Sequence, residues 1–367
     1  MTRELLRPDP DKPTNRLSVI DCDIHPKTSL DDLKPFLARH WWDMLEMYGA
    51  RPRHGFASGF PYPKSQPQAA RRDAWPPGGG LPGSDLKFMR DQLLDFHDMD
   101  FGVMNFLSPT GQGAQNSDLS VAMAYAANEA ARVKWTGPEP RLKASMVVPY
   151  GDGAESAKEI ERLAGMPDYC QVQMLSRTSE LAGKKRYWPI YEAASAHGLP
   201  VSFHVFGYSG WPSTSSGWAS FYIEEMAEHC TSCQSLLSSL VIEGVFERFP
   251  RLKVVLIEAG FAWLPALAHR LDRAWTRLRA ETPHLKRPPS EYIREHVWVT
   301  TQPMEETEKP EHLTQTMEAI GWDRILFATD YPHWDFDDPR HSLPTTLTAA
   351  QRRMILSENA RKLYGFA

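Results

Sequence analysis

The chain has 367 residues, of which 42% are hydrophobic and 24% are charged, and its formal net charge is −5. This composition is that of an ordinary globular protein, and it excludes the disordered, collagen-like and coiled-coil classes. The mild acidity argues against nucleic-acid binding, and no apolar run is long enough for a transmembrane helix. The N-terminal residues lack the apolar core of a secretory signal, so we expect a cytoplasmic protein without a membrane partner.

Eight short apolar or β-branched runs recur along the chain with amphipathic stretches between them, and each run is typical of a strand. The predicted strands are residues 17–23, 101–107, 143–148, 169–175, 200–205, 253–258, 297–300 and 325–328. Strands that alternate with helices indicate a parallel sheet, and eight such units favour an α/β fold of the (β/α)8 TIM-barrel type. An open doubly wound sheet is the alternative, but no glycine fingerprint follows the first run.

Two stretches are longer than simple connections. We expect residues 26–83 to form a lid insertion after strand 1, and a shorter insertion, residues 206–220, to follow strand 5. Both would leave the carboxyl-terminal face of the barrel, where the active sites of this fold lie. One barrel of roughly 250 residues together with these insertions accounts for the whole chain as a single domain, 1–367.

Polar side chains stand at the ends of four predicted strands. Asp23 and His25 follow strand 1 two residues apart, so the period of a strand points both side chains the same way. His204 ends strand 5, Glu258 ends strand 6 and Asp330 follows strand 8. Burying these carboxylates and imidazoles without partners would cost several kcal/mol each, and a divalent cation would satisfy them together. The pattern therefore predicts a metal site in the mouth of the barrel.

The same residues resemble the metal-binding set of the amidohydrolase superfamily. The segments FATDYPHWDFDDP and ILSENARKLYGF resemble the amidohydrolase-related group that includes aminocarboxymuconate-semialdehyde decarboxylase, and LPVSFHV and RLKVVLIEAGFAWLP resemble its strands 5 and 6. The resemblance implies that Asp23, His25 and His204 are metal ligands. It further implies that Asp330 binds or abuts the metal and accepts a proton from its water.

Strand 6 departs from the family pattern. Most members carry a histidine where this chain has Glu258, and in the known decarboxylases that histidine takes part in the chemistry. Glu258 is therefore a candidate both as a metal ligand and as a catalytic group. Gln171 and Gln173 stand where a lysine could otherwise be carbamylated as a metal bridge. Oxygen-rich donor sets suit Fe, Zn or Mn, and we expect one or two such ions per chain.

Further candidates lie near the predicted strand ends. His333 is a candidate catalytic group that polarises a carbonyl or moves a proton. The candidate substrate-binding residues are Gln302 after strand 7 and the aromatic residues Phe206, Tyr208, Trp211 and Trp218 of the second insertion. Cys230 and Cys233 form a C-x-x-C pair inside a predicted helix, so we interpret them and the adjacent His229 as packing residues.

The leading hypothesis from the sequence is a metal-dependent hydrolase. A metal-activated water would attack a thioester, ester or amide of a hydrophobic carboxylic acid, with a coenzyme A thioester and a di-iron centre as one form. The alternative is a non-oxidative decarboxylase or hydratase of an aromatic or unsaturated acid with one divalent metal. A non-enzymatic binding protein is the third class. The expected partner is a small acyl molecule, and we expect the chain to form a homo-oligomer.

Overall fold

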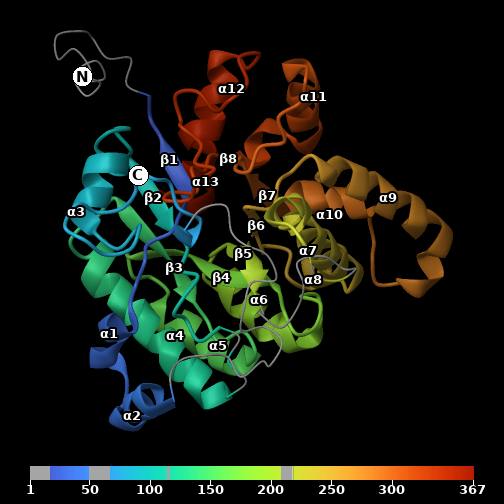
Figure 1. Cartoon of the computed structure of the whole chain (residues 1–367). Helices are drawn as coiled ribbons and strands as arrows, with labels where there is room; N and C mark the ends of the chain where they lie inside the picture. The colour runs from blue at the N-terminus through green and yellow to red at the C-terminus, as the bar shows by residue number, and fades with distance from the viewer. Residues whose placement is uncertain (1–16, 49–66, 113, 115, 208–216, 218) are drawn as a thin grey trace.

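The computed structural model describes residues 17–48, 67–112, 114, 116–207, 217 and 219–367. At its centre lies an eight-stranded sheet whose neighbouring strands run parallel and follow one another in chain order (Figure 1). The strands are β1 (Ile20–Ile24), β2 (Phe101–Met104), β3 (Leu142–Val147), β4 (Tyr169–Arg177), β5 (Val201–Gly207), β6 (Val254–Ile257), β7 (Val297–Thr300) and β8 (Ile325–Leu326). The predicted (β/α)8 barrel is confirmed.

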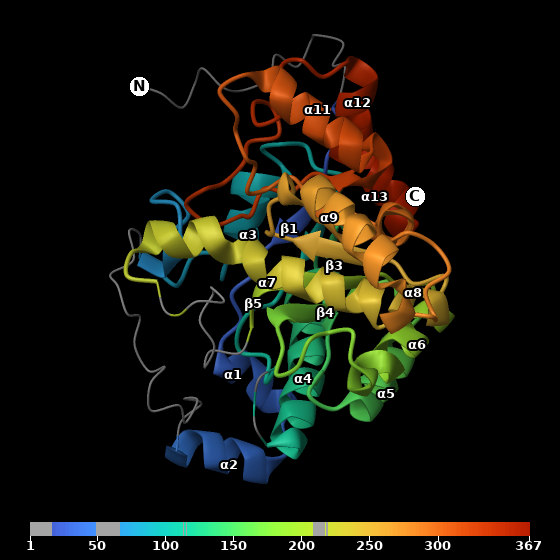
Figure 2. The ribbon, with the colours of Figure 1, turned by 90° about the vertical axis from the view of Figure 1, so that its right-hand side faces the viewer.

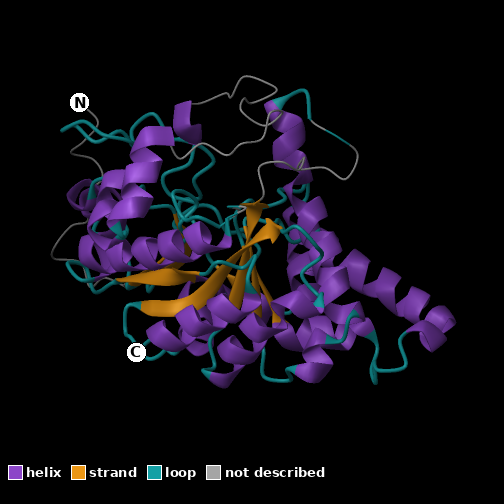
Figure 3. Cartoon of the chain, turned by 90° about the horizontal axis from the view of Figure 1, so that it is seen from below, coloured by secondary structure: helices purple, strands orange, loops and turns teal. Residues whose placement is uncertain are grey.

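Helices surround the strands on the outside of the barrel (Figure 3). They are α1 (Leu30–Leu33), α2 (Arg39–Tyr48), α3 (Leu86–Met89), α4 (Ser117–Ala131), α5 (Gly153–Leu163), α6 (Trp188–Ala196), α7 (Tyr222–Ile242), α8 (Val245–Arg248), α9 (Trp263–Leu278), α10 (Pro289–His296), α11 (Pro310–Ile320), α12 (Ala349–Arg353) and α13 (Asn359–Tyr364). Polar side chains cap several of them. At the start of α5, for example, Asp152 accepts hydrogen bonds from the amides of Ala154 and Glu155.

The barrel closes at a seam between its first and last strands. Strand β8 is only two residues long, but the chain beyond it continues to pair with β1. The amide of Cys22 donates a hydrogen bond of 2.9 Å to the carbonyl of Phe327, and the amide of Asp330 donates one of 3.1 Å to the carbonyl of Asp23. Helix α13 packs on β1 and β8 from outside. The carboxyl ends of the first and last strands therefore lie side by side.

Residues 26–83, which we expected to form a lid, do not form a single cover in the part that the structure describes. Helices α1 and α2 lie beside α4 on the flank of the barrel (Figure 2). Residues 67–83 lie instead against the loop after β8, where Ala70 forms an antiparallel bridge with His333. Residues 49–66 and most of the insertion after β5 fall outside the described residues. Both lids therefore remain predictions.

None of the helices in the described ranges is both long enough and apolar enough to cross a membrane.

Candidate metal centre

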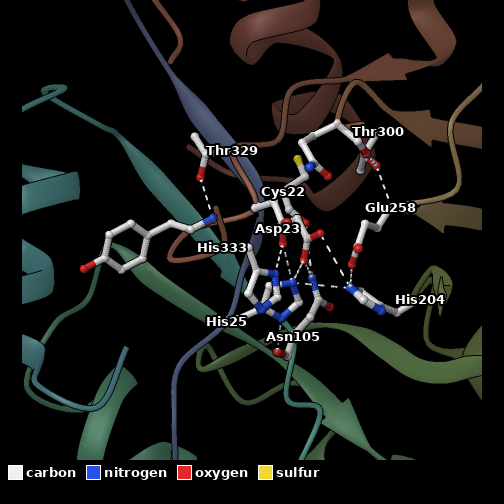
Figure 4. A network of polar contacts seen from close by, with 12 residues as sticks. Cys22, Asp23, His25, Asn105, His204, Glu258, Thr300, Thr329 and His333 are labelled. Carbon is white, nitrogen blue, oxygen red and sulfur yellow. Dashed lines mark hydrogen bonds and ion pairs between the residues drawn. The ribbon is translucent and has the colours of Figure 1, made fainter. Parts of the chain in front are cut away.

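The end of β1 carries Asp23 and His25 into the barrel mouth. Both side chains are buried, and Nε2 of His25 lies 3.1 Å from Oδ1 of Asp23 (Figure 4). Nδ1 of His25 donates a hydrogen bond of 3.0 Å to the carbonyl oxygen of Asn105, which follows β2. Because this bond takes the single proton of a neutral imidazole, Nε2 keeps its lone pair for a ligand.

Strand β5 supplies the second histidine, His204, and the residue directly after β6 is Glu258, whose carboxylate contacts it. Nε2 of His204 lies 2.9 Å from Oε2 of Glu258 and 3.7 Å from Oδ2 of Asp23. Nδ1 of His204 donates to the carbonyl of Val205 at 2.9 Å. The Nε2 atoms of His25 and His204 are 3.3 Å apart. Both imidazoles therefore turn the same atom toward the same point.

The segment after β8 contributes Asp330 and His333. Oδ1 of Asp330 lies 2.9 Å from Nε2 of His25 and 2.6 Å from Nδ1 of His333. The ring of His333 stacks on that of His25, with 4.6 Å between the ring centroids. The side chain of His333 is 16% exposed and that of Asp330 is 1% exposed. His333 is therefore the solvent-facing member of this pair.

Glu258 and Asp330 adopt left-handed backbone conformations, with φ angles of 55° and 61°. Such angles are uncommon outside glycine and cost of order 1–3 kcal/mol each. The amide of Glu258 donates to Oγ1 of Thr300 at 3.1 Å, which helps to hold this conformation. Glu258 directly follows β6 and Asp330 lies in the loop after β8, and both carboxylates lie in the cluster. The fold therefore tolerates local strain at the two places where a carboxylate must face the centre.

The clustered groups perturb one another's protonation. Burial alone would lower the pKa of His204, but Asp23 and Glu258 raise it to about 9. Burial raises the pKa of Asp330 to about 6, although His25 partly offsets this effect. Burial and the neighbouring His25 lower the pKa of His333 to about 4. Groups packed so closely must share protons or a cation to be stable together.

The donor set fits a divalent cation. Ligand atoms lie within 4.8 Å of one another in two overlapping groups, Asp23–His25–His204–Glu258 and His25–Glu258–Asp330–His333. Within the described residues, Oδ2 of Asp23 and Oδ2 of Asp330 are buried and accept no hydrogen bond. Imidazole nitrogens combined with carboxylate oxygens suit first-row divalent metals. All five residues that we predicted as ligands lie in this cluster, which provides a site for a divalent metal ion.

Among the predicted substrate-binding residues, the structure describes the side chain of Gln302 only. Gln302 is buried after β7, and its Nε2 donates a hydrogen bond of 2.9 Å to Oδ2 of Asp335. Tyr208, Trp211 and Trp218 lie outside the described residues. Phe206 belongs to β5, but its side chain is likewise outside the description. Their contacts with a substrate remain predictions.

Two residues at the centre were missed by reasoning from the sequence. Nδ2 of Asn105 donates a hydrogen bond of 2.9 Å to Oδ1 of Asp23, so this side chain orients a predicted ligand. Its position directly after β2 was the available signal. Nδ1 of His229, which we interpreted as a packing residue, lies 3.8 Å from Oε1 of Glu258. Nothing in the periodicity of helix α7 distinguishes this histidine from other buried positions.

A small cavity of about 60 Å³ lies beside the centre. Its lining residues come from the metal cluster, the segment after β1, residues 67–83 and the loops after β2 and β8: His25, Pro26, Lys27, Gln68, Pro82, Leu107, Ser108, Pro332 and His333. Two imidazoles of the cluster therefore face a cavity whose other walls combine proline and leucine side chains with Lys27, Gln68 and Ser108.

Comparison with known proteins places this geometry in a family. A family model described as Amidohydrolase matches residues 20–366. The chain belongs to the amidohydrolase family. Gamma-resorcylate decarboxylase from Polaromonas sp. (strain JS666) is 25% identical over 300 residues, which cover 76% of this chain and 87% of that protein. The family membership expected from the sequence is confirmed.

Solved structures of the family share the barrel. The structure of 5-carboxyvanillate decarboxylase from Sphingomonas paucimobilis matches with a TM-score of 0.67 and 22% identity, covering 96% of this chain and 100% of that one. The dihydroxybenzoic acid decarboxylase from Polaromonas sp. JS666, solved with manganese and 2-nitroresorcinol, matches with a TM-score of 0.63 and 20% identity. It covers 96% of this chain and 97% of that one.

These relatives correct the expected reaction. Our leading hypothesis of an acyl hydrolase is wrong, because the similar proteins named above are decarboxylases of aromatic acids. The expectation of a thioesterase-type di-iron centre came from the carboxylate of Glu258, which stands where most members carry a histidine. The same set of imidazoles and carboxylates serves several reactions, so the donors alone do not determine which bond is broken.

Proposed function

We propose that this chain is a divalent-metal-dependent decarboxylase that removes CO2 from an aromatic carboxylic acid without oxidation. The decarboxylase relatives support the reaction class. The observation that carries the proposal is the Asp330–His333 pair, a buried carboxyl hydrogen-bonded at 2.6 Å to an imidazole that lines the cavity. This pair offers a protonated group beside the metal cluster, with a connection to solvent.

Non-oxidative decarboxylation exchanges a carboxylate for a proton at one ring carbon. The bond between the ring carbon and the carboxylate carbon breaks, CO2 leaves, and the electron pair stays on the ring carbon. That carbon must accept a proton, and a ring hydroxyl eases the exchange because it donates electron density to the ring. A hydroxybenzoic acid is therefore the substrate class that suits the reaction.

In this scheme Asp330 is the proton donor. Its Oδ2 is buried and makes no hydrogen bond within the described residues, while its Oδ1 accepts one from Nδ1 of His333. The proton would leave Oδ2 for the ring carbon, and His333 would return a proton to the carboxylate. Because His333 is the more exposed of the two, it takes the replacement proton from solvent.

The other residues of the centre bind and orient. Asp23, His25 and His204 would hold a divalent ion, with Asp330 beside it. When bound, the ion supplies positive charge that orients the substrate's oxygens and stabilises negative charge developing on them. Glu258, whose Oε2 lies 2.9 Å from Nε2 of His204, would be a further ligand of the ion.

The proposal is tested by incubating manganese-loaded protein with 2,6-dihydroxybenzoate and 5-carboxyvanillate. Loss of the acid is followed by liquid chromatography and release of CO2 by a coupled assay. In D2O the product should carry one deuterium at the carbon that lost CO2. The proposal fails if protein with a verified manganese content releases no CO2 from hydroxybenzoic acids above the enzyme-free rate.

A further inference from the structure

One fully buried carboxylate stands next to the metal site in the sequence without belonging to it. Asp21 lies in β1, two residues before Asp23, and it is a member of neither group of clustered ligand atoms. Among the described residues, no cation forms an ion pair with it. A buried carboxylate is costly unless other groups satisfy it, so its hydrogen-bond donors indicate which parts of the chain it holds in place.

The donors to Asp21 within the described residues come from the two segments that carry Asp23 and Asp330. Oδ1 of Asp21 accepts hydrogen bonds from the amide of Asp23 at 3.1 Å and from the amide of Thr329 at 3.0 Å. Oδ2 accepts a hydrogen bond from the hydroxyl of Thr329. Thr329 directly precedes Asp330 in the sequence. A single carboxylate therefore links the end of β1 to the loop after β8.

Thr329 transmits this link to Asp330. Its hydroxyl accepts a hydrogen bond of 3.1 Å from the amide of Tyr331, and its carbonyl accepts one of 3.0 Å from the amide of Asp337. Thr329 is fully buried, and each of its polar groups is engaged. The left-handed turn at Asp330 is therefore held on both sides, by Thr329 before it and by Tyr331 after it.

The relative placement of Asp23 and Asp330 matters because both carboxylates face one imidazole. Nε2 of His25 lies 3.1 Å from Oδ1 of Asp23 and 2.9 Å from Oδ1 of Asp330. A small shift between the two segments would change the ligand geometry and move the proposed proton donor relative to the substrate.

Resting on the proposed metal centre and decarboxylase function, we infer that Asp21 is a positioning residue that sets the placement of Asp23 and Asp330 relative to each other. It contacts neither the ion nor the substrate. It acts through the amide of Asp23 on one side of the seam and through Thr329 on the other.

Metal affinity and turnover distinguish this role from a general contribution to stability. Asp21→Asn preserves the size of the side chain but replaces one acceptor oxygen by an NH2 group. We expect its manganese affinity, measured by competition with a chelator, to fall about tenfold, as for other partners that orient metal ligands. With manganese saturating, kcat for CO2 release from the hydroxybenzoic acid that the wild type decarboxylates should also fall by about tenfold.

Thr329 allows a second test of the same link. Thr329→Val removes the hydroxyl and should weaken manganese binding by a similar factor, whereas Thr329→Ser should keep most of the wild-type affinity. In the double variant with Asp21→Asn, Thr329→Val should add little further loss, because both changes break the same hydrogen bond. Fully additive losses of manganese affinity would overturn the inference.

Asn359 provides the matched control beside β8. Its buried Nδ2 donates hydrogen bonds of 2.7 Å and 2.8 Å to the carbonyls of Trp322 and Ile325. Asn359→Ala should lower the free energy of unfolding in urea and leave manganese affinity unchanged. Wild-type manganese affinity in Asp21→Asn and Thr329→Val, or an equal loss in Asn359→Ala, overturns the inference. Weaker manganese binding in Asp21→Asn, when the wild type releases no CO2 from any hydroxybenzoic acid, supports the positioning role and rejects the decarboxylase proposal.

Discussion

His25 and Asp330 meet across the seam of the barrel, where Nε2 of the histidine lies 2.9 Å from Oδ1 of the aspartate. One residue comes from the end of β1 and the other follows β8. The metal cluster is therefore built at the place where the sheet closes on itself, and its ligands depend on closure for their positions.

Removing one imidazole should remove the metal. His204→Ala takes away Nε2, which contacts Glu258, Asp23 and His25. We expect the manganese content after dialysis to fall to trace levels and decarboxylation to fall by roughly 100-fold or more. Elemental analysis by mass spectrometry measures the first effect. His269→Ala, on the exposed face of α9, is the control and should keep its metal. A His204→Ala protein with unchanged metal content would exclude His204 as a ligand.

Asn105→Ala should weaken the metal site without removing a ligand. The amide of this side chain donates to Oδ1 of Asp23 at 2.9 Å, and side chains in such supporting positions typically contribute about 10–100-fold to metal affinity. Competition with a chelator of known affinity measures the change. Asn116→Ala, which removes the N-cap of α4, should lower stability and leave metal affinity unaltered. Equal affinities in wild type and Asn105→Ala would show that Asp23 needs no such support.

His333→Gln should separate metal binding from turnover. The change preserves the cavity wall but removes the group that returns a proton to Asp330. We expect an unchanged manganese content and a kcat lowered by about 100-fold, the usual contribution of a positioned acid or base. His312→Gln, in α11, is the matched control. Wild-type kcat in His333→Gln would assign proton resupply to another group.

Tyr364→Phe should destabilise the barrel interior. The Tyr364 hydroxyl donates a hydrogen bond of 2.9 Å to Oε1 of Gln171, which is fully buried in β4. Leaving that oxygen without its donor should cost about 1–3 kcal/mol of unfolding free energy. Urea denaturation measures the loss. Tyr125→Phe, an exposed position in α4, should change stability by less than about 0.5 kcal/mol. Similar losses of unfolding free energy in both variants would contradict a stabilising role for the Tyr364 hydroxyl.

Lowering the pH should reduce the free energy of unfolding, and protonation of Glu139 should contribute to this loss. Hydrogen bonds from Arg141 and Arg90 lower the pKa of this carboxyl to about 2, although burial opposes them. The folded pKa lies below the unfolded value, so the stabilisation is complete above about pH 4.5 and is lost as the pH falls toward 2. Glu139→Gln should lower the unfolding free energy at pH 7 by about 1–2 kcal/mol and flatten its decline below pH 4.5.

The exposed residue Glu318 on α11 is the control for that pH series. Glu318→Gln should leave both the stability at pH 7 and its decline in acid as they are in the wild type. An acid profile of Glu139→Gln that parallels the wild type would show that other carboxyls dominate the decline.

The barrel and its cluster were predictable because both follow from short-range rules. Period-two patterns and apolar runs located all eight strands, and the carboxyl ends of parallel barrel strands necessarily converge. Asp23, His25 and His204 could thus be brought together from sequence positions alone. The left-handed turns at Glu258 and Asp330 could not, since their φ angles depend on contacts such as that with Thr300 on a neighbouring strand.

Other features depend on tertiary context and escaped the sequence patterns. Residues 26–83 were expected to form a lid, yet Trp41 lies in α2 and lines the same surface pocket as Tyr125 of α4, on the flank of the barrel. The short helix α10 has no side-chain N-cap, and only Pro289 marks its start. The support that Asn105 gives to Asp23 required the register between β1 and β2.

The two-residue length of β8 has a consequence for assembly. The last candidate residue of the metal site, Asp330, lies just beyond this strand, whereas the first two, Asp23 and His25, are among the earliest described residues. A chain still being synthesised can present only an incomplete donor set until residue 330 has emerged and docked beside β1. Binding of a metal ion by all of these residues would therefore require the closed barrel, and the bound ion would stabilise the contact between its first and last strands.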